Sequence, residues 1–182
     1  MGKLKSLGVV GSVNSVRVIL TNHDYRKVVL RQTKRPELFG LVGGKIPLGM
    51  LPTSQLLTEI GEETEIEATK ISSLVFLAQF FMVNRTIWYP CAKYRALGFT
   101  LPMNCEDEDE VLIANPQASI FWARIEGDLP ATHAEGRDVT LLDLSEPEKL
   151  SLIKPAHQQV LRQWLDVKGR VESFPREFHW ES

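Results

Sequence analysis

The stretch FGLVGGKIPLGMLPTSQLLTEIGEETEIEA, residues 39–68, decides how the rest of the chain is interpreted. Pro52 suits the first turn of a helix, and the pattern after it predicts a helix of about four turns over residues 53–66. Ile66 lies off the apolar stripe of this helix, so the helix is expected to end near there. The apolar and acidic stripes consist of Leu56, Leu57 and Ile60, and of Glu59, Glu62 and Glu63.

The three glutamates share one face, because residues three and four positions apart are neighbours on a helix. Clustered carboxylates raise one another's pKa values unless a cation or strong hydrogen bonds hold them ionised. Mg²⁺ is a hard cation that prefers oxygen ligands, and glycines at 43 and 44 would let the backbone approach such a site closely. A solvated acidic helix face is the alternative, and the helix alone favours that simpler interpretation.

Residues 44–66 resemble the Nudix box. The pattern of that box is G, five residues, E, seven residues, R-E-U, one residue, E-E, one residue and G-U, where U is a bulky aliphatic residue. The spacing is intact when the first glycine is set on Gly44. The flanking segments extend the resemblance over most of residues 12–168, although only the box is specific. The matching positions are Gly44, Glu59, Ile60, Glu62, Glu63 and Ile66.

Four positions depart from the family pattern, namely Val42, Met50, Thr58 and Glu65. Met50 and Thr58 stand where the family has a glutamate and an arginine that brace each other. Because both members are replaced, no charge is stranded, and we expect Met50 to pack in place of the ion pair. Glu65 stands where glycine would adopt a positive φ, which should cost about 1 kcal/mol.

The resemblance implies an α/β fold, a Nudix-like α/β/α sandwich with a mixed β-sheet. We expect a single domain over residues 1–182, with an insertion around 85–118 and a polar C-terminal tail at 169–182. The local patterns predict a hairpin at 15–32, strand-like segments at 38–42, 71–83, 86–101, 119–127 and 139–144, and a closing helix at 153–167.

The overall charge favours neither a polyanionic nor a membrane partner. The chain carries 21 basic and 23 acidic residues, a formal net charge of −2, so neither nucleic acid nor membrane is expected as a partner. No segment reaches the ~18 continuous apolar residues that a membrane span needs. The spacing of Cys91 and Cys105 permits a disulfide without demanding one. We therefore expect a reduced, cytoplasmic protein.

The resemblance also implies a function. Nudix proteins hydrolyse a pyrophosphate bond in a nucleoside diphosphate-linked or nucleoside triphosphate substrate, with Mg²⁺ or Mn²⁺ as cofactor. If the residue roles of the family hold for this chain, the metal ligands would be Glu59, Glu62 and Glu63, together with a backbone carbonyl of Gly43 or Gly44. The ion would neutralise the diphosphate and lower the pKa of an attacking water. Glu62 and Glu63 are therefore expected to be catalytic as well as metal-binding.

Residues outside the helix complete the predicted site. Glu135, shortly before the last predicted strand, is the candidate general base or extra ligand, and the acidic run Glu106–Glu110 is its rival. An acidic run is more often a solvated loop. The basic residues near the box could contact phosphates, with ordinary surface charge as the alternative. The predicted substrate-binding residues are Arg31 and Lys45, with Lys34 and Arg35 as further candidates.

The sequence leaves the substrate and the activity open. A small nucleotide is the expected ligand, and the aromatic residues Trp88, Tyr89 and Tyr94 would serve base recognition, a homodimer contact or the core. The departures from the box favour an alternative function, a catalytically weak or inactive Nudix-fold module that binds a nucleotide as a sensor or scaffold. A third interpretation is an acidic-helix interaction protein unrelated to nucleotides.

Overall fold

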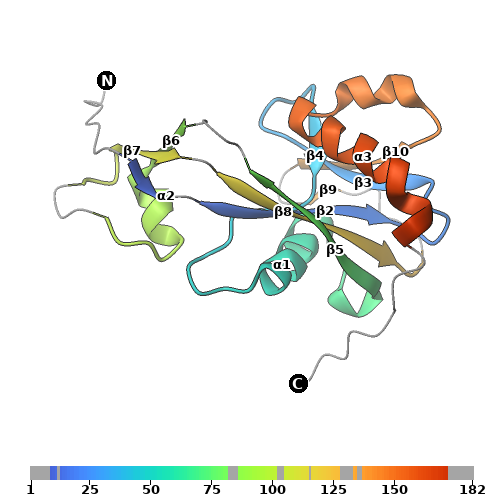
Figure 1. Ribbon diagram of the computed structural model, residues 1–182, viewed down its shortest axis with the longest axis horizontal. Helices are drawn as coiled ribbons and strands as arrows, with labels where there is room; N and C mark the ends of the chain where they lie inside the picture. Colours follow the sequence, from blue (N-terminus) through green and yellow to red (C-terminus); the bar gives the residue numbers. More distant parts are fainter. Residues whose placement is uncertain are drawn as a thin grey trace.

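The computed structural model of the protein describes residues 9–11, 13–81, 86–101, 105–114, 116–127, 133–134 and 137–171. None of the described helices is long and apolar enough to cross a bilayer. The elements, shown in Figure 1, are β1 (Val9–Gly11), β2 (Asn14–Thr21), β3 (Lys27–Gln32), β4 (Phe39–Leu41), α1 (Pro52–Thr64), β5 (Ile71–Phe81), β6 (Thr86–Pro90), α2 (Cys91–Ala96), β7 (Glu110–Ala114), β8 (Gln117–Ile125), β9 (His133–Ala134), β10 (Arg137–Asp143) and α3 (Pro155–Val171).

A mixed seven-stranded sheet forms the centre of the molecule, in the order β5-β8-β2-β3-β10-β9, with β4 paired to β3. Strands β2 and β8 run parallel, whereas the other pairs are antiparallel. The predicted hairpin at 15–32 is confirmed, but β2 and β3 pair only at Leu20–Val29 and Thr21–Val28. Beyond those pairs the two strands diverge, and residues 39–46 pair with both of them.

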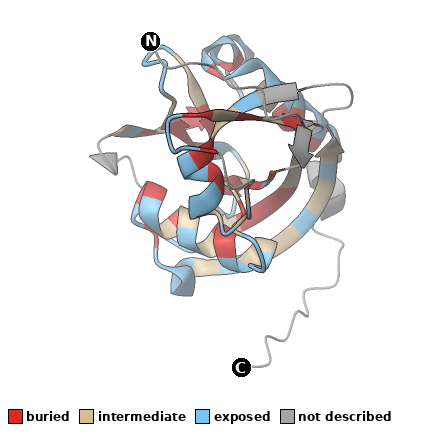
Figure 2. Ribbon diagram, turned by 90° about the vertical axis from the view of Figure 1, so that its left-hand side faces the viewer, coloured by how far each residue is buried: buried red, intermediate tan, exposed pale blue. Residues whose placement is uncertain are grey.

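Helices α1 and α3 cover opposite faces of this sheet (Figure 1). Successive side chains of a strand point to opposite faces. Val18 of β2 accordingly packs in the cluster that holds Leu56 of α1, while Ile19 packs in the cluster that holds Leu161 of α3. The buried residues in Figure 2 follow the central strands, and the helices carry both buried and exposed residues. The predicted α/β/α sandwich with a mixed sheet is confirmed.

Helix α1 has nearly the predicted bounds, but its entrance differs from the prediction. Glu65 ends the helix with a φ of 60°, and its N–H donates to the carbonyl of Gly61 at 2.9 Å, so the left-handed end expected at this position is present. Met50 does not replace the ion pair by packing, since it is 42% exposed. Its N–H donates to the Pro47 carbonyl at 3.1 Å, in a turn that holds Met50 at the surface.

A second sheet, in the order β1-β7-β6, lies at one end of the molecule (Figure 1). Most of it falls within the stretch expected to be an insertion. The strand predicted at 86–101 is correct only as far as Pro90, because residues 91–96 form α2. Cys91 and Tyr94 of α2 are both buried. Their spacing of three residues suits one face of a helical turn, which packs against the second sheet.

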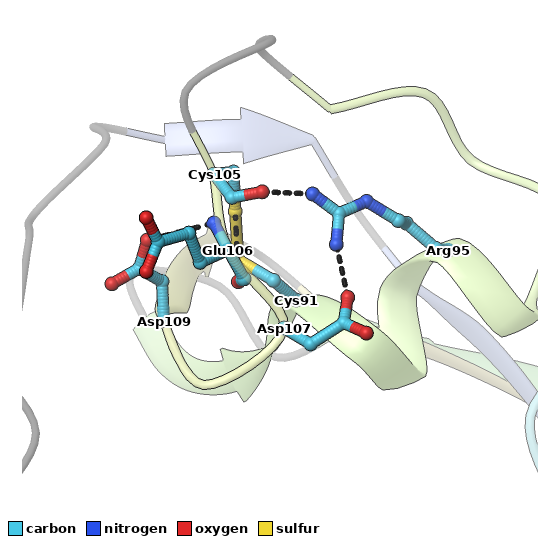
Figure 3. Close-up of a disulfide and its surroundings, with 6 residues drawn as sticks. All are labelled: Cys91, Arg95, Cys105, Glu106, Asp107 and Asp109. Carbon is cyan, nitrogen blue, oxygen red and sulfur yellow. Dashed lines mark hydrogen bonds and ion pairs between the residues drawn. A yellow bond between two sulfur atoms is a disulfide. The ribbon is translucent and has the colours of Figure 1, made fainter.

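Cys91 and Cys105 are joined by a disulfide, with their Cα atoms 6.8 Å apart. Arg95 of α2 donates to the backbone carbonyl of Cys105 and to the carboxylate of Asp107, as Figure 3 shows. The expectation of reduced thiols is therefore wrong, since the chain has only these two cysteines and both are oxidised. The pairing depends on the chain reversal between α2 and β7, which the spacing of the cysteines does not encode.

Candidate functional site

The segment of residues 42–46 lies along the part of β2 that does not pair with β3. The N–H of Val16 donates to the carbonyl of Gly44 at 3.0 Å. Gly43 has a φ of +130°, and a Cβ added there would lie 2.3 Å from the carbonyl oxygen of Val16. Only glycine fits such a close backbone approach. The close approach expected at the paired glycines is therefore present, and its partner is β2.

Glu63 of α1 reaches this segment from the helix. One of its carboxylate oxygens accepts the N–H of Gly43 at 2.8 Å, and the other accepts Nη1 of Arg31 from β3. The side chains of Arg31 and Glu63 are only 10% and 9% exposed. A predicted substrate-binding residue and a predicted metal ligand thus form a buried ion pair, whose loss of hydration is compensated by these hydrogen bonds.

Glu59 lies one helical turn before Glu63, with its carboxylate against the backbone. A Cβ added at Gly44 would fall 1.7 Å from Oε1 of Glu59, and Nε2 of Gln55 donates to the same oxygen at 2.6 Å. Nη1 of Arg17, from β2, donates to the Gly44 carbonyl at 3.3 Å. Burial lowers the pKa of Arg17, and the negative charge of Glu59 acts in the opposite direction. Arg17 is therefore a cation positioned at the glutamate helix.

The arrangement offers only some of the oxygen donors that a divalent cation needs. Glu62 is exposed and Glu59 is partly exposed, whereas Glu63 and the Gly44 carbonyl already accept hydrogen bonds from the protein. Among the residues that the structure describes, no three acidic, histidine or cysteine side chains converge as a ready metal site. Mg²⁺ is commonly bound by one or two carboxylates plus substrate phosphates. The donor set therefore fits an ion that arrives with a phosphate ligand.

A pocket of about 560 Å³ opens beside Glu63. Among the residues that the structure describes, its lining contains six cationic side chains and a single carboxylate, that of Glu63. The whole chain has a formal net charge of −2, so this is a strong local concentration of positive charge. A concave basic surface of this kind attracts anions such as phosphates. The six cationic residues are Arg17, Arg31, Lys34, Arg35, Arg137 and Lys154.

His157, near the start of α3, also lines this pocket. Its Nδ1 accepts the N–H of Leu41 at 2.9 Å, so the neutral ring carries its proton on Nε2. Burial lowers the pKa of His157 to about 3, and the positive charges of Arg17 and Lys154 contribute to the shift. His157 is therefore a neutral hydrogen-bond donor at physiological pH.

Among the described residues, Lys45 and the acidic run are absent from the pocket lining. Lys45 does not belong to the lining; its Nζ lies 6.0 Å from the ring centroid of Tyr89. Burial and neighbouring positive charges lower the pKa of Lys45 to about 8. Glu135 lies outside the described residues. Glu106, Asp107 and Asp109 of the acidic run lie beside the disulfide (Figure 3). The run is not part of the described pocket lining.

Four charged or titratable residues of the pocket lining were not predicted from the sequence. A signal was available for Arg17, because a single charge within the apolar run VRVIL is unusual for a central strand. No comparable signal exists for Lys154 and His157, because they reach the pocket only through the docking of α3 and of the residue before it. The four residues are Arg17, Arg137, Lys154 and His157.

Solved structures of Nudix proteins have the same arrangement of helices around a mixed sheet, and this chain has the Nudix fold. No protein-family model and no curated protein matches the sequence. The solved structures of known Nudix proteins are similar at low identity, so that likeness establishes the fold alone.

Three of these structures illustrate the similarity. A MutT from a study of Aliivibrio salmonicida and Vibrio cholerae has 12% identity and a TM-score of 0.54, over 84% of this chain and 93% of that one. The E. coli dihydroneopterin triphosphate pyrophosphohydrolase has 18% identity and a TM-score of 0.51, over 83% and 93%. The NUDIX domain of Shewanella oneidensis NrtR, complexed with ADP ribose, has 17% identity and a TM-score of 0.50, over 88% of each chain.

Proposed function

We propose that the protein is a pyrophosphohydrolase that binds a nucleoside diphosphate-linked or nucleoside triphosphate substrate in the basic pocket. The observation that carries this proposal is the meeting of six cationic side chains with Glu63 of the glutamate helix in one pocket. The Nudix fold supports the same class of reaction.

Each part of the site has a role in this proposal. Phosphoryl transfer depends mainly on positioning and on charge stabilisation, and Arg17 and the other pocket cations would orient the diphosphate. Glu59 and Glu62 would hold the divalent cation, Mg²⁺ or Mn²⁺, which when bound neutralises phosphate charge and lowers the pKa of a water. Glu62 is exposed and would accept the proton of the attacking water, with Glu135 as the second candidate. Glu63 would keep Arg31 and Gly43 in position.

Turnover of a substrate panel tests the proposal. The panel consists of nucleoside triphosphates, dinucleotides and nucleotide sugars, assayed for phosphate and monophosphate release with Mg²⁺ and with Mn²⁺. Glu62→Gln should abolish release and leave the thermal unfolding midpoint unchanged, because the residue is exposed. Glu67→Gln removes an exposed carboxylate just beyond α1 and should leave release intact. Equal activity of both variants would overturn the role of Glu62.

A nucleotide sensor is the second candidate function, and one observation favours it. Both oxygens of Glu63 are engaged by Arg31 and Gly43, so one of the three helix carboxylates is already compensated without a metal. The solved NrtR domain was complexed with ADP ribose. A sensor should be thermally stabilised by a nucleotide and yield no product in the same panel.

Location and assembly are proposed on sequence grounds only. We retain the cytoplasm as the proposed location, although disulfides seldom persist in cytosolic proteins, so the disulfide weighs against it. We also retain a homodimer as an option. Light scattering of the purified chain, with and without a nucleotide, would settle the assembly.

A further inference from the structure

We infer that Arg17 and a divalent cation compete for the carbonyl of Gly44, and that Arg17 moves to the phosphates of the ligand when a cation takes this carbonyl. Metal binding and diphosphate binding are thereby coupled through one side chain. This inference rests on the proposed function and describes a regulation of the same site. Its basis is the hydrogen bonding of the Gly44 carbonyl, the position of Glu59 and the N–H groups that Arg17 can offer to a ligand.

The first argument is the hydrogen bonding of the Gly44 carbonyl. Its oxygen accepts the N–H of Val16 at 3.0 Å and Nη1 of Arg17 at 3.3 Å. A carbonyl oxygen has two lone pairs, so both are engaged. The bond from Val16 belongs to the backbone pairing between β2 and residues 42–46, whereas the side chain of Arg17 can rotate away. A divalent cation therefore gains full access to this carbonyl when Arg17 leaves it.

The second argument is the position of Glu59, a proposed ligand of the cation. Its carboxylate lies against Gly44, since a Cβ added there would fall 1.7 Å from Oε1 of Glu59. Burial lowers the pKa of Arg17 and the charge of Glu59 opposes that shift, so the guanidinium and this carboxylate attract each other. A divalent cation would use the same carboxylate and the same carbonyl. Because like charges at such short range repel, the cation and Arg17 cannot both keep these partners.

The third argument is the set of N–H groups that Arg17 can offer to a ligand. Its Nη1 donates to the carbonyls of Val16 and Gly44. Within the part of the chain that the structure describes, Nε and Nη2 of Arg17 make no hydrogen bond to the protein. Arg17 also lines the basic pocket. A guanidinium is a planar fork that binds phosphate through two N–H groups, so Arg17 can exchange the carbonyl for a phosphate.

The experiment measures the two ligands separately, on the full native chain and on Arg17→Met. Mn²⁺ binding is followed by electron paramagnetic resonance without phosphate, and inorganic pyrophosphate binding by calorimetry in buffer stripped of metal ions. Loss of the competing cation should tighten Mn²⁺ binding about threefold or more, whereas loss of the fork should weaken pyrophosphate binding about tenfold. Weaker or unchanged Mn²⁺ binding, or no Mn²⁺ binding to either protein, would overturn the inference. A merely structural arginine would weaken both ligands on removal.

Two further variants locate the effects. Lys34→Gln removes an exposed pocket cation and should weaken pyrophosphate, but leave Mn²⁺ binding within about twofold of the native affinity. Tightening of Mn²⁺ as large as in Arg17→Met would show a general effect of charge and contradict the competition. Glu59→Gln should weaken Mn²⁺ about tenfold. Native Mn²⁺ affinity in that variant would place the ion elsewhere, and the inference would be wrong.

Arg17→Lys keeps the test decisive if Arg17→Met does not fold, which circular dichroism and the thermal unfolding midpoint of each variant reveal. Lysine keeps the charge but is a point donor without the planar fork. Mn²⁺ binding should therefore stay within about twofold of the native affinity, while pyrophosphate should bind about threefold or more weakly. Native pyrophosphate affinity in Arg17→Lys would show that the fork does not hold phosphate.

The substrate panel separates this inference from the proposed function. Opposite changes of the two affinities in a protein that hydrolyses no member of the panel would retain the competition and reject the hydrolase. Hydrolysis that depends on Glu62, together with parallel losses of both affinities in Arg17→Met, would retain the hydrolase and reject the competition.

Discussion

Two adjacent glycines at the entrance of the glutamate helix are required for different physical reasons. At Gly43 an added Cβ would collide with a backbone carbonyl, and φ is +130°. At Gly44 the three atoms nearest the added Cβ all belong to the carboxylate of Glu59, the far end of a side chain that can rotate. Gly61 within α1 is different again, because the nearest atom to its added Cβ is 3.9 Å away.

Glycine-to-alanine substitutions at these three positions should therefore have clearly different effects on the free energy of unfolding. Gly43→Ala should destabilise the protein by about 2–4 kcal/mol, since the backbone cannot yield. Gly44→Ala should cost about 1 kcal/mol or less but displace Glu59 and reduce any metal-dependent turnover. Gly61→Ala should stabilise by about 0.5–1 kcal/mol through helix propensity. Urea unfolding of the three variants measures the order, and a larger loss for Gly44→Ala than for Gly43→Ala would contradict it.

The buried histidine gives a prediction about pH. The pKa of His157 is about 3 in the folded protein and about 6.5 when unfolded. Between pH 6.5 and 3, His157 therefore binds a proton in the unfolded chain and stays neutral in the folded protein. The free energy of unfolding should fall as the pH decreases from 6.5 toward 3. Within that window the slope from this group is about 1.4 kcal/mol per pH unit.

His157→Gln supplies the comparison for this pH effect. Glutamine can accept the Leu41 N–H but does not titrate, so the free energy of unfolding should fall less steeply between pH 5.5 and 4.5 by about 1 kcal/mol. Chemical denaturation at several pH values measures both slopes. Identical slopes would show that the histidine is protonated in the folded state.

At the scale of single elements, sequence patterns correctly predicted those helices and strands that depend mainly on short-range interactions. Alternation and turn residues located the hairpin at 15–32, and Pro52 with the periodicity after it located α1. The failure at residues 91–101 has a physical cause. Tyr94 and its aromatic neighbours have high strand propensity, but burial of Cys91 and Tyr94 on one side of a turn outweighs that propensity.

The ion pair between β3 and α1 gives the prediction for this scale. Arg31→Met leaves Glu63 buried without its cation, and Glu63→Gln leaves Arg31 without that carboxylate. Each single substitution should cost about 3 kcal/mol or more. The double variant should lose less than the sum of the two, because neither charge is then stranded. Urea unfolding of the native protein, the two single variants and the double variant completes a double-mutant cycle. If the losses of unfolding free energy in the two single variants add up to the loss in the double variant, the contact between Arg31 and Glu63 contributes nothing.

At the scale of the whole molecule, the candidate site draws on strands β2, β3, β4 and β10 and on helices α1 and α3. The box spacing identified the residues of one helix, including Glu59 and Glu63, because they are local in sequence. It did not show that Arg31 would pair with Glu63, nor that His157 would enter from the far end of the chain. Those facts depend on the packing of distant elements, which a single sequence does not display.

The disulfide permits a test at the same scale. Cys91 and Cys105 are 14 positions apart, and closing a loop of this length stabilises a protein by about 2–3 kcal/mol in the chain-entropy account. The variant with both cysteines changed to alanine should lose about that much in urea unfolding under air. Addition of dithiothreitol should destabilise the native protein equally and leave the variant unchanged. A native protein that does not respond to dithiothreitol, with free thiols by mass spectrometry, would refute the bond.

The parallel pairing of β2 with β8 has a consequence for synthesis on the ribosome. Asn14 lies opposite Gln117, about a hundred positions later in the chain, and such non-local pairing is slow to form. Phe121 and Ala123 of β8 complete the core against which α1 packs. A nascent chain that ends before β8 therefore exposes the apolar side of the glutamate helix. The N-terminal half, although it carries the whole box, should be unable to fold or bind on its own and should depend on chaperones until β8 emerges.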